Sequence, residues 1–119
     1  FNELFLDFEQ PLVIVEGVFD AINAGGNIVP ILGSTLDEQH PLFQKIIEHN
    51  TTIYLALDHD AQKKEVSIAR SLRAYGIDVY KINTKGYQDV GVMPRNIYHN
   101  RKKTAEIFTE TSLLSHRLL

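Results

Sequence analysis

Short apolar runs that alternate with helical stretches constrain the fold of this chain more than any other feature. Residues 12–15 form a continuous aliphatic run rich in β-branched side chains, which is typical of a strand buried on both faces. Residues 52–57 have the same character, and residues 61–75 then carry apolar side chains at helical spacing. Strands and helices in alternation predict parallel βαβ units, so we expect an α/β fold.

Similar patterns predict the rest of the sheet and its helices. The further elements, in chain order, are a helix at 18–24 closed by Gly25 and Gly26, a strand at 28–32, a helix at 41–49 and a strand at 78–82. Pro30 cannot donate to a strand ladder, so its strand is expected at or near a sheet edge. We therefore predict a four-stranded, mainly parallel sheet flanked by helices.

The predicted sheet also defines the organisation of the chain. We expect a leading segment at 1–10, the α/β domain at 11–93 and a C-terminal helical extension at 94–119, within which 101–118 favours helix. The sequence begins at Phe1 rather than methionine, which predicts a piece of a longer protein.

The composition excludes several classes of protein. The 119 residues suffice for one domain, and no apolar run approaches the length that spans a bilayer, so no membrane partner is expected. Cysteine is absent, which excludes disulfides and predicts no zinc in this chain. The formal net charge of −3 is not that of a protein that binds nucleic acid through its overall field. A nucleic-acid role would need a local site, a metal ion or a basic neighbour.

Acidic residues follow three of the predicted strands. Glu16 comes directly after the first strand with Asp20 one helical turn later, Asp58 and Asp60 follow the third, and Asp89 lies in the loop after the fourth. Sites in parallel sheets lie beyond the carboxyl ends of the strands, so these acids should converge at one edge. Two carboxylates about 4 Å apart repel by roughly 4 kcal/mol at an effective dielectric near 20. A divalent cation would relieve this repulsion.

The type of ligand indicates the type of ion. Carboxylates without cysteine or paired histidines suit Mg²⁺, for which Mn²⁺ can substitute, and Mg²⁺ is most often an agent of phosphoryl transfer. Gly17 lets the backbone pass close to a ligand. Further candidates are residues that would contact phosphate oxygens or shape the turn after the second strand: Lys63, Lys64, Lys85, Gly33 and Ser34.

Each candidate also has a purely structural interpretation. Asp60 fits the N-cap of the helix that is predicted to start at residue 61. Ordinary helix-face, loop, turn or solvated-surface positions would account for Asp20, Asp89, Gly33, Ser34, Lys63 and Lys64. The joint placement of the acids at successive strand ends, rather than any single residue, favours a metal site.

The Glu16-Gly17 and Asp58-His59-Asp60 motifs resemble the signature of the TOPRIM family, which has a Glu-Gly after the first strand and an Asp-x-Asp after the third strand of a Rossmann-like sheet. The resemblance covers roughly residues 11–93. Within the family the details are most similar to bacterial and bacteriophage DNA primases, on the positions Gly33-Ser34, Leu36, Gln39 and Ala69-Arg70. Residues 88–91 depart from the primase loop motif, because its basic residue, its proline and its following acid are replaced or absent.

The resemblance implies a nucleotidyltransferase of DNA replication that makes RNA primers from nucleoside triphosphates on single-stranded DNA, in the cytoplasm of a bacterial or phage-infected cell. Glu16, Asp58 and Asp60 would be catalytic and, with Asp89, would hold Mg²⁺, while Asp20 and Gly17 would support them. Primases also need a basic subdomain and a zinc-binding module that this chain lacks, so the isolated chain is expected to make little or no primer. A helicase domain or subunit is a further expected partner.

Two other interpretations remain open. A TOPRIM nuclease or topoisomerase would use the same acids to cut DNA. A non-enzyme alternative is a degenerate TOPRIM or receiver-like interaction module. A receiver would place an acid pair after the first strand and a single acid after the third, which Glu16-Gly17 and Asp58-x-Asp60 fit poorly.

Overall fold

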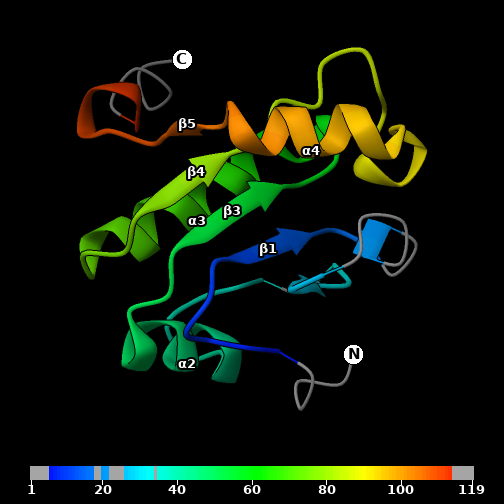
Figure 1. The fold of residues 1–119 in the computed structure, drawn as a ribbon. Coiled ribbons are helices and arrows are strands. Elements are labelled where there is room, and N and C mark those ends of the chain that lie inside the picture. The colour runs from blue at the N-terminus through cyan, green and yellow to red at the C-terminus, as the bar shows by residue number, and fades with distance from the viewer. Residues whose placement is uncertain (1–5, 18–19, 22–25, 34, 114–119) are drawn as a thin grey trace.

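The computed structural model describes residues 6–17, 20–21, 26–33 and 35–113. In this part of the chain a five-stranded sheet has the order β2-β1-β3-β4-β5 (Figure 1). The strands are β1 (Leu12–Val15), β2 (Ile28–Pro30), β3 (Ile53–Ala56), β4 (Val79–Lys81) and β5 (Glu106–Ile107). The first four strands pair in parallel, and β5 pairs antiparallel with β4. The prediction of a mainly parallel α/β sheet is confirmed, and β2 lies at an edge as its proline indicated.

Helices connect and cover these strands. They are α2 (Pro41–His49), α3 (Gln62–Ala74) and α4 (Arg95–Lys103), with short 3₁₀ turns η2 (His59–Ala61) and η3 (Val90–Val92). The ends of α2 follow from its sequence: His40 accepts a hydrogen bond from the Leu42 amide at 3.1 Å, Pro41 occupies the first turn, and Asn50 ends the helix at φ 51°. Asp20 and Ala21 are helical as well.

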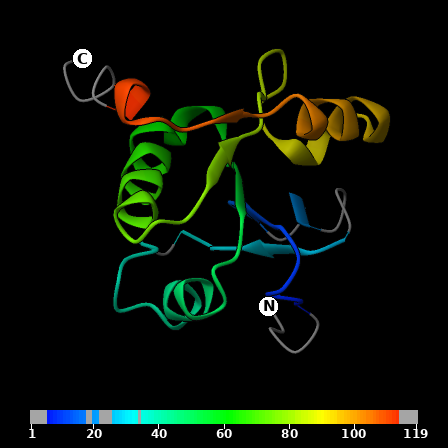
Figure 2. The same cartoon turned by 60° about the vertical axis from the view of Figure 1, so that its left-hand side comes forward.

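The alternation of side chains along the strands divides the core into two layers. Leu12 and Ile14 of β1 face a cluster built with α2 and α3, and the β5 segment adds Phe108 to that cluster. Val13 and Val15 face the other way, into a cluster with residues of η3 and α4 such as Val90 and Tyr98. In Figure 2, α2 and α3 accordingly lie on one side of the strands and α4 on the other.

Two predictions about the C-terminal part are wrong. Among the described residues the sheet has five strands rather than four. The predicted helix at 101–118 is interrupted: α4 ends at Lys103, β5 follows, and residues 110–113 are helical again. The physical reason is burial, because Phe108 lies in the core with 5% exposure and its amide donates to the carbonyl of Val79 at 2.8 Å. A continuous helix could not make that sheet contact.

Some of the other expectations fall on residues outside the described part of the chain. Of the helix predicted at 18–24, only residues 20–21 are described, and Ser34 and residues 114–119 are also outside the described part. None of the helices in the described ranges is long and apolar enough to cross a membrane.

Candidate metal centre

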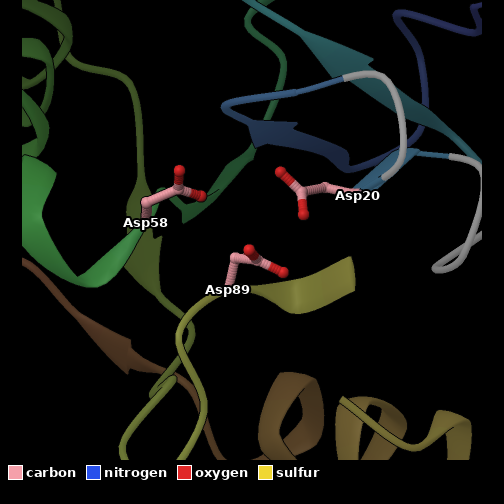
Figure 3. A group of neighbouring side chains, drawn as sticks. All are labelled: Asp20, Asp58 and Asp89. Atoms are coloured by element: carbon pink, nitrogen blue, oxygen red, sulfur yellow. The ribbon is translucent and has the colours of Figure 1, made fainter. Parts of the chain in front are cut away.

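Three aspartates meet at the carboxyl edge of the parallel strands. Asp58 follows β3, Asp20 lies in the helical turn after β1, and Asp89 precedes η3. One carboxylate oxygen from each lies within 4.8 Å of the others, and the three side chains point toward one another (Figure 3). The carboxyl ends of the parallel strands therefore bring together residues that are up to 69 positions apart in the sequence.

Asp20 is the most buried member of this aspartate trio and ties two loops together. Its side chain accepts hydrogen bonds from the amide of Gly17 at 3.0 Å and from the amide of Gly91 at 2.9 Å. At 6% exposure, burial raises its pKa and the nearby charge of Asp89 adds to the rise, while the two amide donors oppose it. Asp20 thus fixes the loop of Asp89 against the end of β1.

Gly91 is required by this contact. A Cβ on residue 91 would lie 2.8 Å from Oδ1 of Asp20 and 3.0 Å from Oδ1 of Asp89. By contrast, a Cβ on Gly17 would meet Asp20 at 3.5 Å, an ordinary contact. A side chain at residue 91 would therefore disturb the aspartates, whereas the expected approach of the Gly17 backbone to a ligand stays a prediction.

Asp58 is where negative charge is most concentrated. Burial, followed by the charges of Asp20, Asp89, Glu16 and Asp60, raises its pKa to about 6. Its Oδ1 atom is buried and has no hydrogen-bond partner among the described residues. A buried carboxylate oxygen without a donor is costly, and a cation would satisfy it.

Glu16 lies beside the trio and already has one cationic partner. Its Oε1 atom accepts from Nζ of Lys64 at 3.2 Å, and both side chains are about one quarter exposed. Its Oε2 atom is buried and unpartnered within the described ranges. One oxygen of Glu16 is therefore held by Lys64 and the other remains available.

Asp60 and Asp89 differ in how firmly they are held. Asp89 accepts a hydrogen bond from the Val92 amide at 3.2 Å and so caps η3. Asp60 is exposed within η2, and α3 begins with Ala61 rather than Asp60 at its N-cap. The structural interpretation of Asp60 as a helix cap is therefore wrong, while its charge is among those that raise the pKa of Asp58.

The other predicted candidates in the described part of the chain are Gly33, Lys63 and Lys85. Gly33 is exposed after β2, at φ 76°, and fits the tight-turn interpretation. Lys63 is exposed in the first turn of α3. The backbone of Lys85 is held in the loop after β4, where its amide donates to Asn83 and its carbonyl accepts from Arg101.

The residues present fit a hard divalent cation. Buried, unpartnered oxygens on Asp58 and Glu16 and three converging carboxylates form an all-oxygen set, and Mg²⁺ prefers such ligands. The absence of cysteine leaves no thiolate for a zinc site of the structural type. The trio could therefore hold a metal ion of the magnesium class.

Sequence reasoning missed three residues that shape this edge. Gly91 carries a signal, since it lies two residues after Asp89, but its contact with Asp20 depends on tertiary structure. The buried Glu65 forms an ion pair with the partly exposed Lys81, and nothing in their spacing indicates it. A glutamate on the predicted inner face of α3 was the available sign, because buried acids are uncommon without a partner.

A comparison with solved structures agrees with the fold, whereas comparisons of the sequence find no match. No family model matches the sequence, and neither does any curated protein. Among solved structures, the chain is similar to the Aquifex aeolicus primase, in a crystal structure of its zinc-binding and RNA polymerase domains, with a TM-score of 0.65 and 21% identity. The alignment covers 85% of this chain and 27% of that one. The chain therefore has a primase-like fold and spans about a quarter of the length of that protein chain.

Proposed function

We propose that this chain is a TOPRIM domain that binds Mg²⁺ and forms the metal centre of a DNA primase. The observation that carries the proposal is the meeting of Asp20, Asp58 and Asp89 at the carboxyl edge of the parallel sheet, with oxygens within 4.8 Å of one another. The Glu-Gly and Asp-x-Asp motifs and the primase-like fold support the same assignment.

The aspartate trio would hold the ion, with Glu16 and Asp60 beside it. A bound Mg²⁺ supplies charge neutralisation and orientation to the phosphate oxygens of a nucleotide. The protein contributes fixed carboxylates: Asp20 is held by two amides, and Asp89 by one. Preorganised ligands of this kind avoid the cost of assembling several negative charges at the moment of binding.

Two lysines frame the same edge and suit a phosphate-bearing substrate. Lys64 neutralises Glu16 at 3.2 Å, which keeps that carboxylate near the aspartate trio. Lys63, the residue before Lys64, is exposed and could contact the phosphate groups of a substrate. The substrates under this proposal are nucleoside triphosphates and single-stranded DNA, with the template bound mainly by parts of the protein outside this chain, including a helicase domain or subunit.

Metal binding is the first test. We expect Mn²⁺ titrated into the purified chain to bind by calorimetry, and Asp58→Asn to weaken binding at least about tenfold, because it removes a ligand charge at the centre of the cluster. Asp60→Asn should weaken it as well. The matched control is Asp78→Asn. Asp78 precedes β4, at the opposite end of the strands from the trio, and pairs with Arg73 at 3.4 Å. Equal Mn²⁺ affinity in all three variants and the native chain would refute the metal site.

The reaction is tested separately, in a protein that carries this chain with its flanking domains. Primer synthesis from ribonucleoside triphosphates on single-stranded DNA, lost in the Asp58→Asn variant, is the expected result. Nicking of supercoiled plasmid without primer synthesis would replace the primase assignment with a nuclease or topoisomerase. Neither activity, together with no metal binding, would favour a non-catalytic interaction module.

A further inference from the structure

Glu65 is a buried acid that takes no direct part in the cluster of carboxylates. It lies in the first turn of α3 and is only 2% exposed. Its Oε2 atom accepts a hydrogen bond from the amide of Leu57 at 3.0 Å, and its Oε1 atom is ion-paired with Nζ of Lys81 on β4. Leu57 is the residue immediately before Asp58.

The hydrogen bond to Leu57 replaces one that the sheet does not make. Along the β3–β4 ladder the amide of Ile53 donates to the carbonyl of Asp78, and the amide of Ile82 donates to the carbonyl of Leu55. Parallel ladders repeat every two residues, so the amide of Leu57 would next donate to the carbonyl of Ile82. It donates to Glu65 instead. The chain therefore leaves the β3–β4 ladder at Leu57, and the buried amide of Leu57 still has a hydrogen-bond acceptor in Glu65.

We propose that Glu65 is a positioning residue that sets where Asp58 enters the metal centre, an inference that rests on the proposed metal site. The carboxylate of Glu65 anchors the backbone one residue before Asp58 and directs the chain away from β4. Asp58 can then reach Asp20 and Asp89 instead of continuing along the sheet. Groups that orient metal ligands in this way commonly change metal affinity 10–100-fold when they are removed.

Lys81 compensates the negative charge of Glu65, which lies close to the other acids. An unpaired carboxylate behind Asp58 would be buried at high cost and would repel the trio. The ammonium group of Lys81 compensates that charge, and the side chain of Lys81 is 38% exposed, so it keeps contact with water. The geometry thus separates two roles: the oxygen facing Leu57 positions the chain, and the oxygen facing Lys81 is neutralised.

Two substitutions at residue 65 distinguish positioning from charge. Glu65→Gln retains an oxygen that can accept from the Leu57 amide, while Lys81 can turn to solvent. Glu65→Ala removes the acceptor. We expect Mn²⁺ affinity, measured by calorimetry, to fall about 10–100-fold in Glu65→Ala and to stay within about threefold of the native value in Glu65→Gln. Leu72→Ala is the matched control, because it removes a fully buried side chain from the same helix away from the acids.

A second measurement does not depend on metal. In the metal-free chain, hydrogen exchange at the Leu57 amide should accelerate about 100-fold or more in Glu65→Ala relative to neighbouring β3 amides, and Glu65→Gln should restore protection. Unchanged Leu57 exchange in Glu65→Ala, or an equal loss of Mn²⁺ affinity in Leu72→Ala, would overturn the positioning role. If the native chain binds no Mn²⁺ while Leu57 exchange behaves as expected, the metal site fails and the Glu65 anchor stands as a structural contact only.

Discussion

Asp58 carries an electrostatic penalty in the folded chain when no cation is bound. Its pKa is raised from 3.8 to about 6, first by burial and then by the charges of neighbouring acids such as Asp20 and Asp89. A raised pKa means that the ionised form is less favourable in the folded state than in the unfolded state. The stability associated with the neutral form is therefore fully present below about pH 4 and is lost as the pH rises through about 6.

Replacing Asp58 with asparagine should remove this penalty. At pH 7 in EDTA we expect Asp58→Asn to be more stable than the native chain by about 1–3 kcal/mol, because a shift of one pKa unit corresponds to about 1.4 kcal/mol. At pH 4 the two proteins should unfold at nearly the same urea concentration, since Asp58 is then largely protonated. Asp78→Asn serves as the control at the opposite end of the strands. A stability difference that is the same at both pH values would contradict the electrostatic origin.

Among the elements, those with strong local patterns were predictable. The aliphatic run of β1 and the amphipathic stretch of α3 each bury a face that the sequence displays, so both lie where expected within a residue or so. The two-residue strand β5 has no such pattern. It exists because Phe108 is buried against the β4 side of the sheet, and long-range packing of that kind leaves no local signature.

The candidate site, too, was predictable in part from the sequence and depended in part on tertiary contacts. The convergence of acids from different strand ends could be predicted, because it follows from the topology of a parallel sheet. The tight grouping of Asp20 with Asp58 and Asp89 could not, because it depends on the amides of Gly17 and Gly91 that orient Asp20. From the sequence alone, Asp20 is expected only as a supporting residue, because an acid on a helix is usually a surface residue.

The segment after α4 should contribute to the stability of the domain. We expect Phe108→Ala to lower the free energy of unfolding by about 3–5 kcal/mol, because it empties a buried position in the core shared with α2 and α3. The neighbouring Ile107→Ala is the control: Ile107 is 40% exposed and should cost about 0.5 kcal/mol or less. Equal urea midpoints for the two variants would show that this segment is an extension outside the domain, as the predicted boundary at residue 93 implies.

For the molecule as a whole, folding gathers carboxylates that the unfolded chain keeps apart. The net charge is −3, yet the acids of the trio and Glu16 bring local negative charge far above that average. A bound divalent cation compensates the cluster only in the folded state, because the unfolded chain does not hold these residues together. Binding and folding are therefore linked through mass action.

Magnesium should accordingly raise the thermal stability of the whole chain. At a Mg²⁺ concentration about 100 times Kd, the linkage contributes about 2.7 kcal/mol, which for a domain of this size raises Tm by roughly 10 °C. The rise should be reversed by EDTA and should be small in Asp58→Asn. NaCl at matched ionic strength is the critical control, because screening alone acts weakly on partly buried charges. If NaCl raises Tm as much as MgCl₂ does, the cluster is relieved by general screening and holds no specific ion.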